Sequence, residues 1–335
     1  MTLLATVALT TVALAALTML VRTPAVKRAW AVFLSLFVGF LKEHRTLAGL
    51  LGVGFERSDV WESTRADTAL GLPAVGGIFK RLIGIGPHFG DDEYIRALKA
   101  RQRKMVRELD MVEPLRKLAG RTMTVAELET HLLAVWLDEI VGAYGLEEPS
   151  DREAFLRGMA TVRTLIDKIA ATPLSAVFDA ISRWHELTPV RTYLSSIGDI
   201  DGALLLAPFL TTIDTTLLNL VVAPPADGHA SFHQLFALSP VKMAPMISKS
   251  RGLVIVDIVP NQMDSPGNTA FGPKGVVCPG NLVTSAILKE VQRIQALLSF
   301  ELAPGSPKPV LIGDIVQNIG NRADVIIEIK ERIEK

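Results

Sequence analysis

The sequence predicts a mainly α-helical protein with small β-sheets and an N-terminal membrane helix. Three observations lead to this fold class: residues 1–21 carry no charged side chain, residues 91–222 show helical spacing of apolar side chains almost throughout, and strand-like runs follow only after residue 250. The 335 residues, 49% of them hydrophobic, are enough to bury a large core. The formal charge is zero and no basic block occurs, so nucleic acid is not an expected partner.

The N-terminal apolar segment is long enough to cross a bilayer. A helix of about twenty residues is roughly 30 Å long, which matches the hydrocarbon core. Arg22, Lys27 and Arg28 follow it, so the positive-inside rule keeps the body cytosolic, at the endoplasmic reticulum in a eukaryote. A cleaved signal peptide is the alternative, but no basic region precedes the apolar run. The expected organisation is a signal-anchor helix at 1–22, a membrane-proximal segment at 23–90 and a catalytic domain at 91–335.

A second apolar run extends from Ala29 to Leu41 and is too short to span a membrane. It has two interpretations, a helix in the plane of the membrane interface or a buried core helix. From Thr46 to Gly90 the chain is punctuated by glycine and proline and shows no clear period. We therefore assign no element to that range.

The middle of the chain reads as a series of helices separated by proline and glycine. Apolar spacing predicts helices at 94–112, from Thr124 onward, at 151–172, at 174–186 and at 200–222. Thr124 and Glu127 have the spacing of a capping box. The basic face of the first helix, which includes Arg103 and Arg107, is typical of a solvated surface.

The last of these helices is the most apolar, yet Thr211, Asp214 and Thr215 lie in its interior. Buried polar groups cost free energy unless they are paired or functional. One interpretation is that the hydroxyl groups bond to carbonyls one turn back. The other is a functional site, beside a kink at Pro208.

The only cysteine, Cys278, lies in a loop rich in glycine and proline, directly before an amphipathic helix at 281–299. Gly275 and Gly280 permit backbone conformations that a side chain would block, and Pro279 suits the first position of a helix. The N-terminal end of that helix would favour the thiolate form of the cysteine. A thiolate held in this way can be the axial ligand of a haem iron.

The loop resembles the cysteine-ligand loop of cytochrome P-450 proteins, F-G-x-G-x-[HR]-x-C-x-G. Four positions are in register: Phe271, Gly272, Cys278 and Gly280. Lys274 stands in place of the second glycine, and Val276 in place of the basic residue that meets a haem propionate. The family's buried E-x-x-R ion pair is also missing, because His233 and Phe236 occupy its positions.

The order of the flanking elements also resembles that family. A central helix, a strand at 252–259, the cysteine loop, an amphipathic helix and a late hairpin of strands 310–316 and 324–330 follow one another. The central helix can be aligned with the family's A-G-x-[DE]-T pattern in two registers. In one, Thr211 takes the threonine position; in the other, Asp214 takes the acidic position and Thr215 the threonine position. The resemblance therefore implies a cytochrome P-450-like fold.

The resemblance also implies a site. It implies haem b, with Cys278 as the iron ligand and Arg251 as a partner of a haem propionate. It also implies that Thr211, Asp214 and Thr215 transfer protons. The loop residues implied in cofactor binding are Phe271, Gly272, Lys274 and Gly280. The implied partners are a reductase that takes electrons from NAD(P)H and a lipophilic substrate of secondary metabolism, such as a terpenoid, polyketide or fatty-acid derivative.

Three functions remain open from the sequence. The first is monooxygenase-like oxidation of a lipophilic small molecule. The second is redox-neutral or peroxide-type haem chemistry, such as dehydration, isomerisation or cyclisation, which the uncertain relay and the predicted kink at Pro208 favour. The third is a binding protein with the same fold and no haem, which the loss of the E-x-x-R pair favours.

Overall fold

The structure is a computed structural model, and it describes residues 24–35, 37–57, 60, 68–69, 83–84, 92–171, 173–207, 212–222, 243–248, 251–257, 280–312 and 318–332. The helices are α2 (Pro24–Ser35), α3 (Val38–Glu43), α4 (Arg45–Leu50), α6 (Asp92–Glu108), α7 (Val112–Arg116), α8 (Val125–Tyr144), α9 (Arg152–Ala171), α10 (Pro173–Ser182), α11 (Trp184–Ile197), α12 (Asp199–Ala207), α13 (Ile213–Leu217), the π-helix η2 (Leu218–Val222) and α15 (Asn281–Leu297). The strands are β1 (Gly54–Arg57), β2 (Thr68–Ala69), β3 (Thr122–Thr124), β4 (Met243–Ser248), β5 (Gly252–Asp257), β6 (Leu298–Leu302), β7 (Val310–Ile312), β8 (Asn318–Gly320) and β9 (Ile326–Glu331). The prediction of a mainly helical protein with small sheets is confirmed.

Among the helices that the structure describes, none has the length and apolarity that a bilayer crossing needs. Residues 1–22 lie outside the described part of the chain, so the signal-anchor helix stays a prediction.

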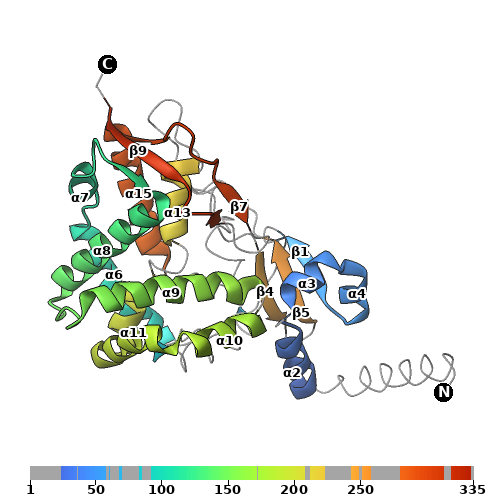
Figure 1. Cartoon of the computed structure of the whole chain (residues 1–335). Coiled ribbons are helices and arrows are strands. Elements are labelled where there is room, and N and C mark those ends of the chain that lie inside the picture. The colour runs from blue at the N-terminus through green and yellow to red at the C-terminus, as the bar shows by residue number, and fades with distance from the viewer. Residues whose placement is uncertain are drawn as a thin grey trace, which may run out of the picture.

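The helical body is built around α8, which follows β3 directly (Figure 1). The predicted capping box is confirmed: the Thr124 amide donates to Glu127 Oε2 at 2.7 Å, and the Glu127 amide donates to Thr124 Oγ1 at 3.2 Å. The helix ends at Gly145, whose φ of 62° is left-handed and suits glycine. The helix predicted at 174–186 is divided at Arg183 into α10 and α11.

The N-terminal sheet has the strand order β1-β5-β4-β2. β1 is parallel to β5, with Gly54 beside Val254, and β2 is antiparallel to β4. Sequence analysis assigned no element to 46–90, so it missed β1 and β2. These strands have only four and two residues, too few for a period to appear, and their partners lie far along the chain.

Helices α2 and α3 cover this sheet with one face. Ala31, Leu34, Val38 and Leu41 are buried in a cluster with Leu253 and Ile255 of β5. The buried-core interpretation of the run from Ala29 to Leu41 therefore holds for this face. The opposite face is different, because Phe33 and Phe40 remain about half exposed.

The C-terminal strands form two further sheets, with orders β3-β9-β6 and β7-β8. The predicted hairpin of 310–316 with 324–330 is wrong: Val310 pairs with Gly320, whereas β9 pairs with β6 and β3. The predicted helix 281–299 also ends earlier, since β6 begins at Leu298. These differences arise because strand partners depend on tertiary contacts that a local pattern does not encode.

Candidate active site

The central helix that sequence analysis singled out is helical in both parts that the structure describes. α12 ends at Ala207, and the chain continues from Thr212 through α13 into η2. Asp214 and Thr215 are both buried on α13. Thr211 and Pro208 lie outside the described residues, so the relay threonine of the first register and the predicted kink stay predictions.

The polar groups of this helix bond mainly to its own backbone. Thr216 Oγ1 donates to the Thr212 carbonyl at 2.8 Å, and Asn219 Nδ2 donates to the Thr215 carbonyl at 2.8 Å. Gln295 Nε2 of α15 donates to the Asn219 carbonyl at 2.9 Å. These contacts support the interpretation that side chains satisfy carbonyls one turn back. They coincide with a π-helical turn, a feature frequent at functional sites.

Asp214 lies in a buried network of four charged side chains. Arg163 of α9 pairs with its Oδ1 atom, and Arg322, in the turn after β8, donates to the same atom at 2.6 Å. Glu129 of α8 completes the network: its Oε2 atom lies 2.6 Å from Arg322 Nη1 and its Oε1 atom 3.2 Å from Arg163 Nε. Two guanidinium groups thus face two carboxylates, which is the condition under which buried charges are tolerated.

Sequence analysis found Asp214 and missed its three partners. Arg163 carried a usable signal, because it follows Phe155 and Met159 at intervals of four on α9, and all three are fully buried. A charged residue in an apolar stripe requires a partner. Glu129 and Arg322 carried no comparable signal, since their nearness to Asp214 depends on the packing of distant segments.

The N-terminus of α15 lies directly after the cysteine loop. Gly280 is the N-cap residue, and since glycine has no side chain it gives this helix no side-chain cap. The predicted apolar stripe is confirmed, with Val283, Ile287 and Val291 buried. Cys278, Phe271, Gly272 and Lys274 lie outside the described residues. The helix starts three residues after Cys278, and its positive N-terminal end would fit a thiolate ligand of haem.

The first turn of α15 also touches the central helix. The hydroxyl groups of Thr212 and Thr284 are 3.1 Å apart and share a hydrogen bond. Thr284 is six positions after Cys278. This contact therefore holds the N-terminal turn of α15, the end of the helix nearest to Cys278 in the sequence, against the start of α13.

The proposed propionate partner, Arg251, lies in the turn between β4 and β5 and pairs with Glu56 of β1. Its side chain is 42% exposed. Arg103 and Arg107 are exposed on α6, as expected for a solvated face. Among the described residues, the Arg251 guanidinium thus forms an ion pair within the N-terminal sheet. Its binding to a haem propionate stays a prediction.

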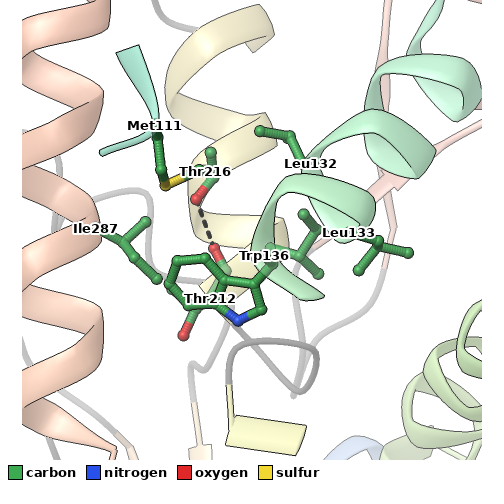
Figure 2. A pocket seen from close by; sticks show the side chains of 8 residues that line it. Met111, Leu132, Leu133, Trp136, Thr212, Thr216 and Ile287 are labelled. Carbon is green, nitrogen blue, oxygen red and sulfur yellow. Dashed lines mark hydrogen bonds between the residues drawn. The ribbon is translucent and has the colours of Figure 1, made fainter. Parts of the chain in front are cut away.

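A small pocket lies between α8, α13, α15 and Met111, the residue before α7 (Figure 2). Its lining is mostly apolar and consists of Met111, Leu132, Leu133, Trp136, Thr212, Ile213, Thr216 and Ile287. Trp136 Nε1 is buried and has no hydrogen-bond acceptor in the described part of the chain. A buried donor without an acceptor costs free energy. Among the described residues, the Trp136 indole therefore lines the pocket with a hydrogen bond unmade.

Acidic groups cluster beside this pocket. The Met111 amide donates to Glu290 Oε2 at 3.1 Å, and Arg293 pairs with Glu290 Oε1 at 2.6 Å. Burial raises the pKa of Glu139, and the nearby charges of Asp110 and Glu290 act in the same direction. The pairing with Glu290 in turn raises the pKa of Arg293.

No family model matches the sequence, and no curated protein matches it. Solved structures do match. The chain is similar in structure to cytochrome P-450 proteins. A structure from work on unusual cytochrome P-450-like monooxygenases of microbial secondary metabolism has a TM-score of 0.41 and 14% identity, over 76% of this chain and 80% of that chain.

Two further matches are of the same kind. CYP154A1 from Streptomyces coelicolor A3(2) has a TM-score of 0.40 and 14% identity, over 75% of this chain and 77% of that chain. A zebrafish cytochrome P-450 with abiraterone has a TM-score of 0.39 and 16% identity, over 76% and 81%. Likeness at this level says nothing about chemistry, which depends on individual residues.

Proposed function

We propose that this chain is a haem-thiolate enzyme that acts on a lipophilic small molecule of secondary metabolism, with Cys278 as the iron ligand. The observation that carries the proposal is the N-terminus of α15, which has a glycine as its N-cap and begins at Asn281 directly after the cysteine loop. The positive end of a helix stabilises a thiolate. Haem held by a thiolate supplies oxidative chemistry. Arg251, Phe271, Gly272, Lys274 and Gly280 are its proposed protein contacts.

Other residues and partners complete this proposal. The contact between Thr212 and Thr284 holds the cysteine end of α15 against the central helix. Thr211, Asp214 and Thr215 are the proposed proton relay. A reductase that uses NAD(P)H would supply electrons, and residues 1–22 would attach the chain to a membrane with its body in the cytosol.

A second candidate is redox-neutral or peroxide-type catalysis, and the network around Asp214 favours it. Oxygen activation of the monooxygenase type needs an acid and an alcohol that exchange protons. Asp214 Oδ1 is instead bound by Arg163 and Arg322 inside the fold. A carboxylate engaged in this way is suited to holding helices together.

The ligand assignment is tested on the full chain, reduced and exposed to carbon monoxide. We expect a Soret band at the position typical of thiolate-bound haem, lost in Cys278→Ala and retained in Val276→Ala, a change in the same loop. A folded, colourless protein would contradict both enzyme proposals and leave the haem-less binding protein.

The two chemistries differ in their need for electrons. With a reductase and NAD(P)H, oxygen-dependent turnover of lipophilic compounds should fall strongly in Thr215→Ala and recover in Thr215→Ser. Turnover that needs neither reductant nor peroxide, and that Thr215→Ala leaves unchanged, would establish the redox-neutral alternative.

A further inference from the structure

The pocket between α8, α13 and α15 is lined by two kinds of side chain (Figure 2). Most of the lining is apolar, but Trp136 of α8 adds an indole N–H, and Thr212 and Thr216 at α13 add two hydroxyl groups. A cavity with only apolar walls stays dry, whereas a cavity on which several polar groups converge can hold a water molecule. The polar groups of this lining therefore decide what the pocket can bind.

Trp136 is the member of the lining that requires a partner. The residue is 3% exposed, and its Nε1 atom has no acceptor among the residues that the structure describes. Trp30, by contrast, donates from Nε1 to the Leu51 carbonyl at 3.3 Å. A buried indole normally finds an acceptor, because its N–H gives up a hydrogen bond to solvent on burial. Figure 2 shows the indole of Trp136 beside Thr212, so a ligand in this pocket is placed to be that acceptor.

The two threonine hydroxyl groups already have partners, yet both oxygens can accept a further bond. Thr216 Oγ1 donates to the Thr212 carbonyl at 2.8 Å, and Thr212 Oγ1 shares a hydrogen bond of 3.1 Å with Thr284 Oγ1. A hydroxyl group has one donor and two acceptor positions, whereas an indole N–H only donates. A ligand that satisfies all three groups must therefore accept from Trp136 and donate to the threonines. Water does both and needs the least space.

We propose that this pocket is the binding site of one ordered water molecule, which accepts from Trp136 Nε1 and donates to Thr212 Oγ1 and Thr216 Oγ1. The pocket has room for about one water molecule, and about three hydrogen bonds are typical of a buried water. Ordering a water typically costs less free energy than leaving a buried donor unpaired.

The bound water would connect three helices. It joins α8 to the start of the central helix, and the bond between Thr212 and Thr284 continues the connection to the first turn of α15. The water is thus a positioning element of the central helix. This inference does not depend on haem or on the proposed chemistry.

The first test removes the indole N–H and keeps the shape of the side chain. In the full chain, Trp136 is replaced by 3-benzothienylalanine, in which sulfur takes the place of the N–H group. We expect the melting temperature to fall by about 1–3 °C, because a hydrogen bond to the water is lost. If the N–H were unpaired in a dry pocket, its removal would raise the melting temperature or leave it unchanged. The control is the same replacement at Trp184, which is 39% exposed and should show no shift.

The second test detects the water directly. The full chain is labelled with ¹⁵N in its tryptophan indoles, and the Trp136 signal is identified by its loss in Trp136→Phe. We expect a nuclear Overhauser cross-peak between the Trp136 indole proton and water, with the sign that distinguishes a long-lived bound water from exchange with solvent. In Thr216→Val the water loses one acceptor, so the same 3-benzothienylalanine replacement should lower the melting temperature by less than in the native chain.

Three results would overturn the proposal. The first is a melting temperature that rises or stays the same on replacement of Trp136 by 3-benzothienylalanine. The second is a Trp136 indole signal without a cross-peak to bound water. The third is strict additivity of the replacement at Trp136 with Thr216→Val. None of these measurements uses the Soret band, so failure here is distinguishable from failure of the haem proposal.

Discussion

Arg322 donates a hydrogen bond to Asp214 across 2.6 Å and so joins the turn after β8 to the central helix. The same guanidinium reaches Glu129, 193 positions earlier in the chain. With Arg163 these residues tie α8, α9, α13 and the C-terminal strands together. His233 and Phe236 stand where the resemblance places an E-x-x-R pair, and the fold contains a different ion network, built from other elements.

Removal of one member should leave an uncompensated buried charge. We expect Arg163→Met to lower the free energy of unfolding by about 3–5 kcal/mol, because Glu129 and Asp214 would share a single guanidinium. Urea unfolding measures this change. Arg157→Met, on the exposed side of the same helix, is the control and should cost less than about 1 kcal/mol.

The double variant Arg163→Met with Asp214→Leu removes one charge of each sign. We expect it to be less destabilised than the sum of the two single variants, since Glu129 and Arg322 can still pair. Strict additivity in urea unfolding would show that the four charges do not act as a network.

Two glycines in helices should respond oppositely to alanine. At Gly158 of α9, a Cβ atom would lie 2.4 Å from the Glu186 carbonyl oxygen and 2.5 Å from Val190 Cγ2 of α11. We expect Gly158→Ala to destabilise the protein by about 1–3 kcal/mol through overpacking. At Gly142 of α8 nothing lies within 4 Å, so Gly142→Ala should stabilise by about 0.5–1 kcal/mol. Equal thermal shifts in the two variants would refute the close packing of α9 on α11.

The capping box at the start of α8 should be worth about 1 kcal/mol, because Thr124→Ala leaves the Glu127 amide without its acceptor. Thr124→Ser keeps the hydroxyl and should unfold close to the native chain. Thr164→Ala, within α9, is the control for loss of a threonine and should have little effect. If both alanine variants lose the same stability, the cap contributes nothing specific.

The stability conferred by Glu186 should depend on pH. Hydrogen bonds from Arg183, and then from Thr161, lower the pKa of this carboxyl group. A carboxyl group with a lowered folded-state pKa stabilises the protein above its unfolded pKa, about 4.3, and loses that contribution as the pH falls through the folded value. The difference in melting temperature between the native chain and Glu186→Gln should therefore be largest near neutral pH and shrink in acid. A constant difference from pH 7 to pH 3 would contradict this.

The elements that follow from local pattern were predicted well. The capping box of Thr124 and Glu127, the apolar stripe of α15 and the strand at β5 all depend on residues a few positions apart. Strand partners could not be predicted in this way. β7 joins β8 rather than the last strand, and β1 and β2 find partners near residue 250, because pairing is decided by where distant segments meet.

The candidate site shows the same difference between what a local pattern predicts and what tertiary contacts decide. The sequence by itself determined which residues are candidates for chemistry: a lone cysteine before a helix, and an acid with hydroxyl groups inside an apolar helix. Only the tertiary structure decided what surrounds that acid, because Glu129, Arg163 and Arg322 are brought to Asp214 from three distant segments by the packing of their helices and strands. Spacing along a chain records periodicity, whereas the pairing of buried charges depends on distance in space.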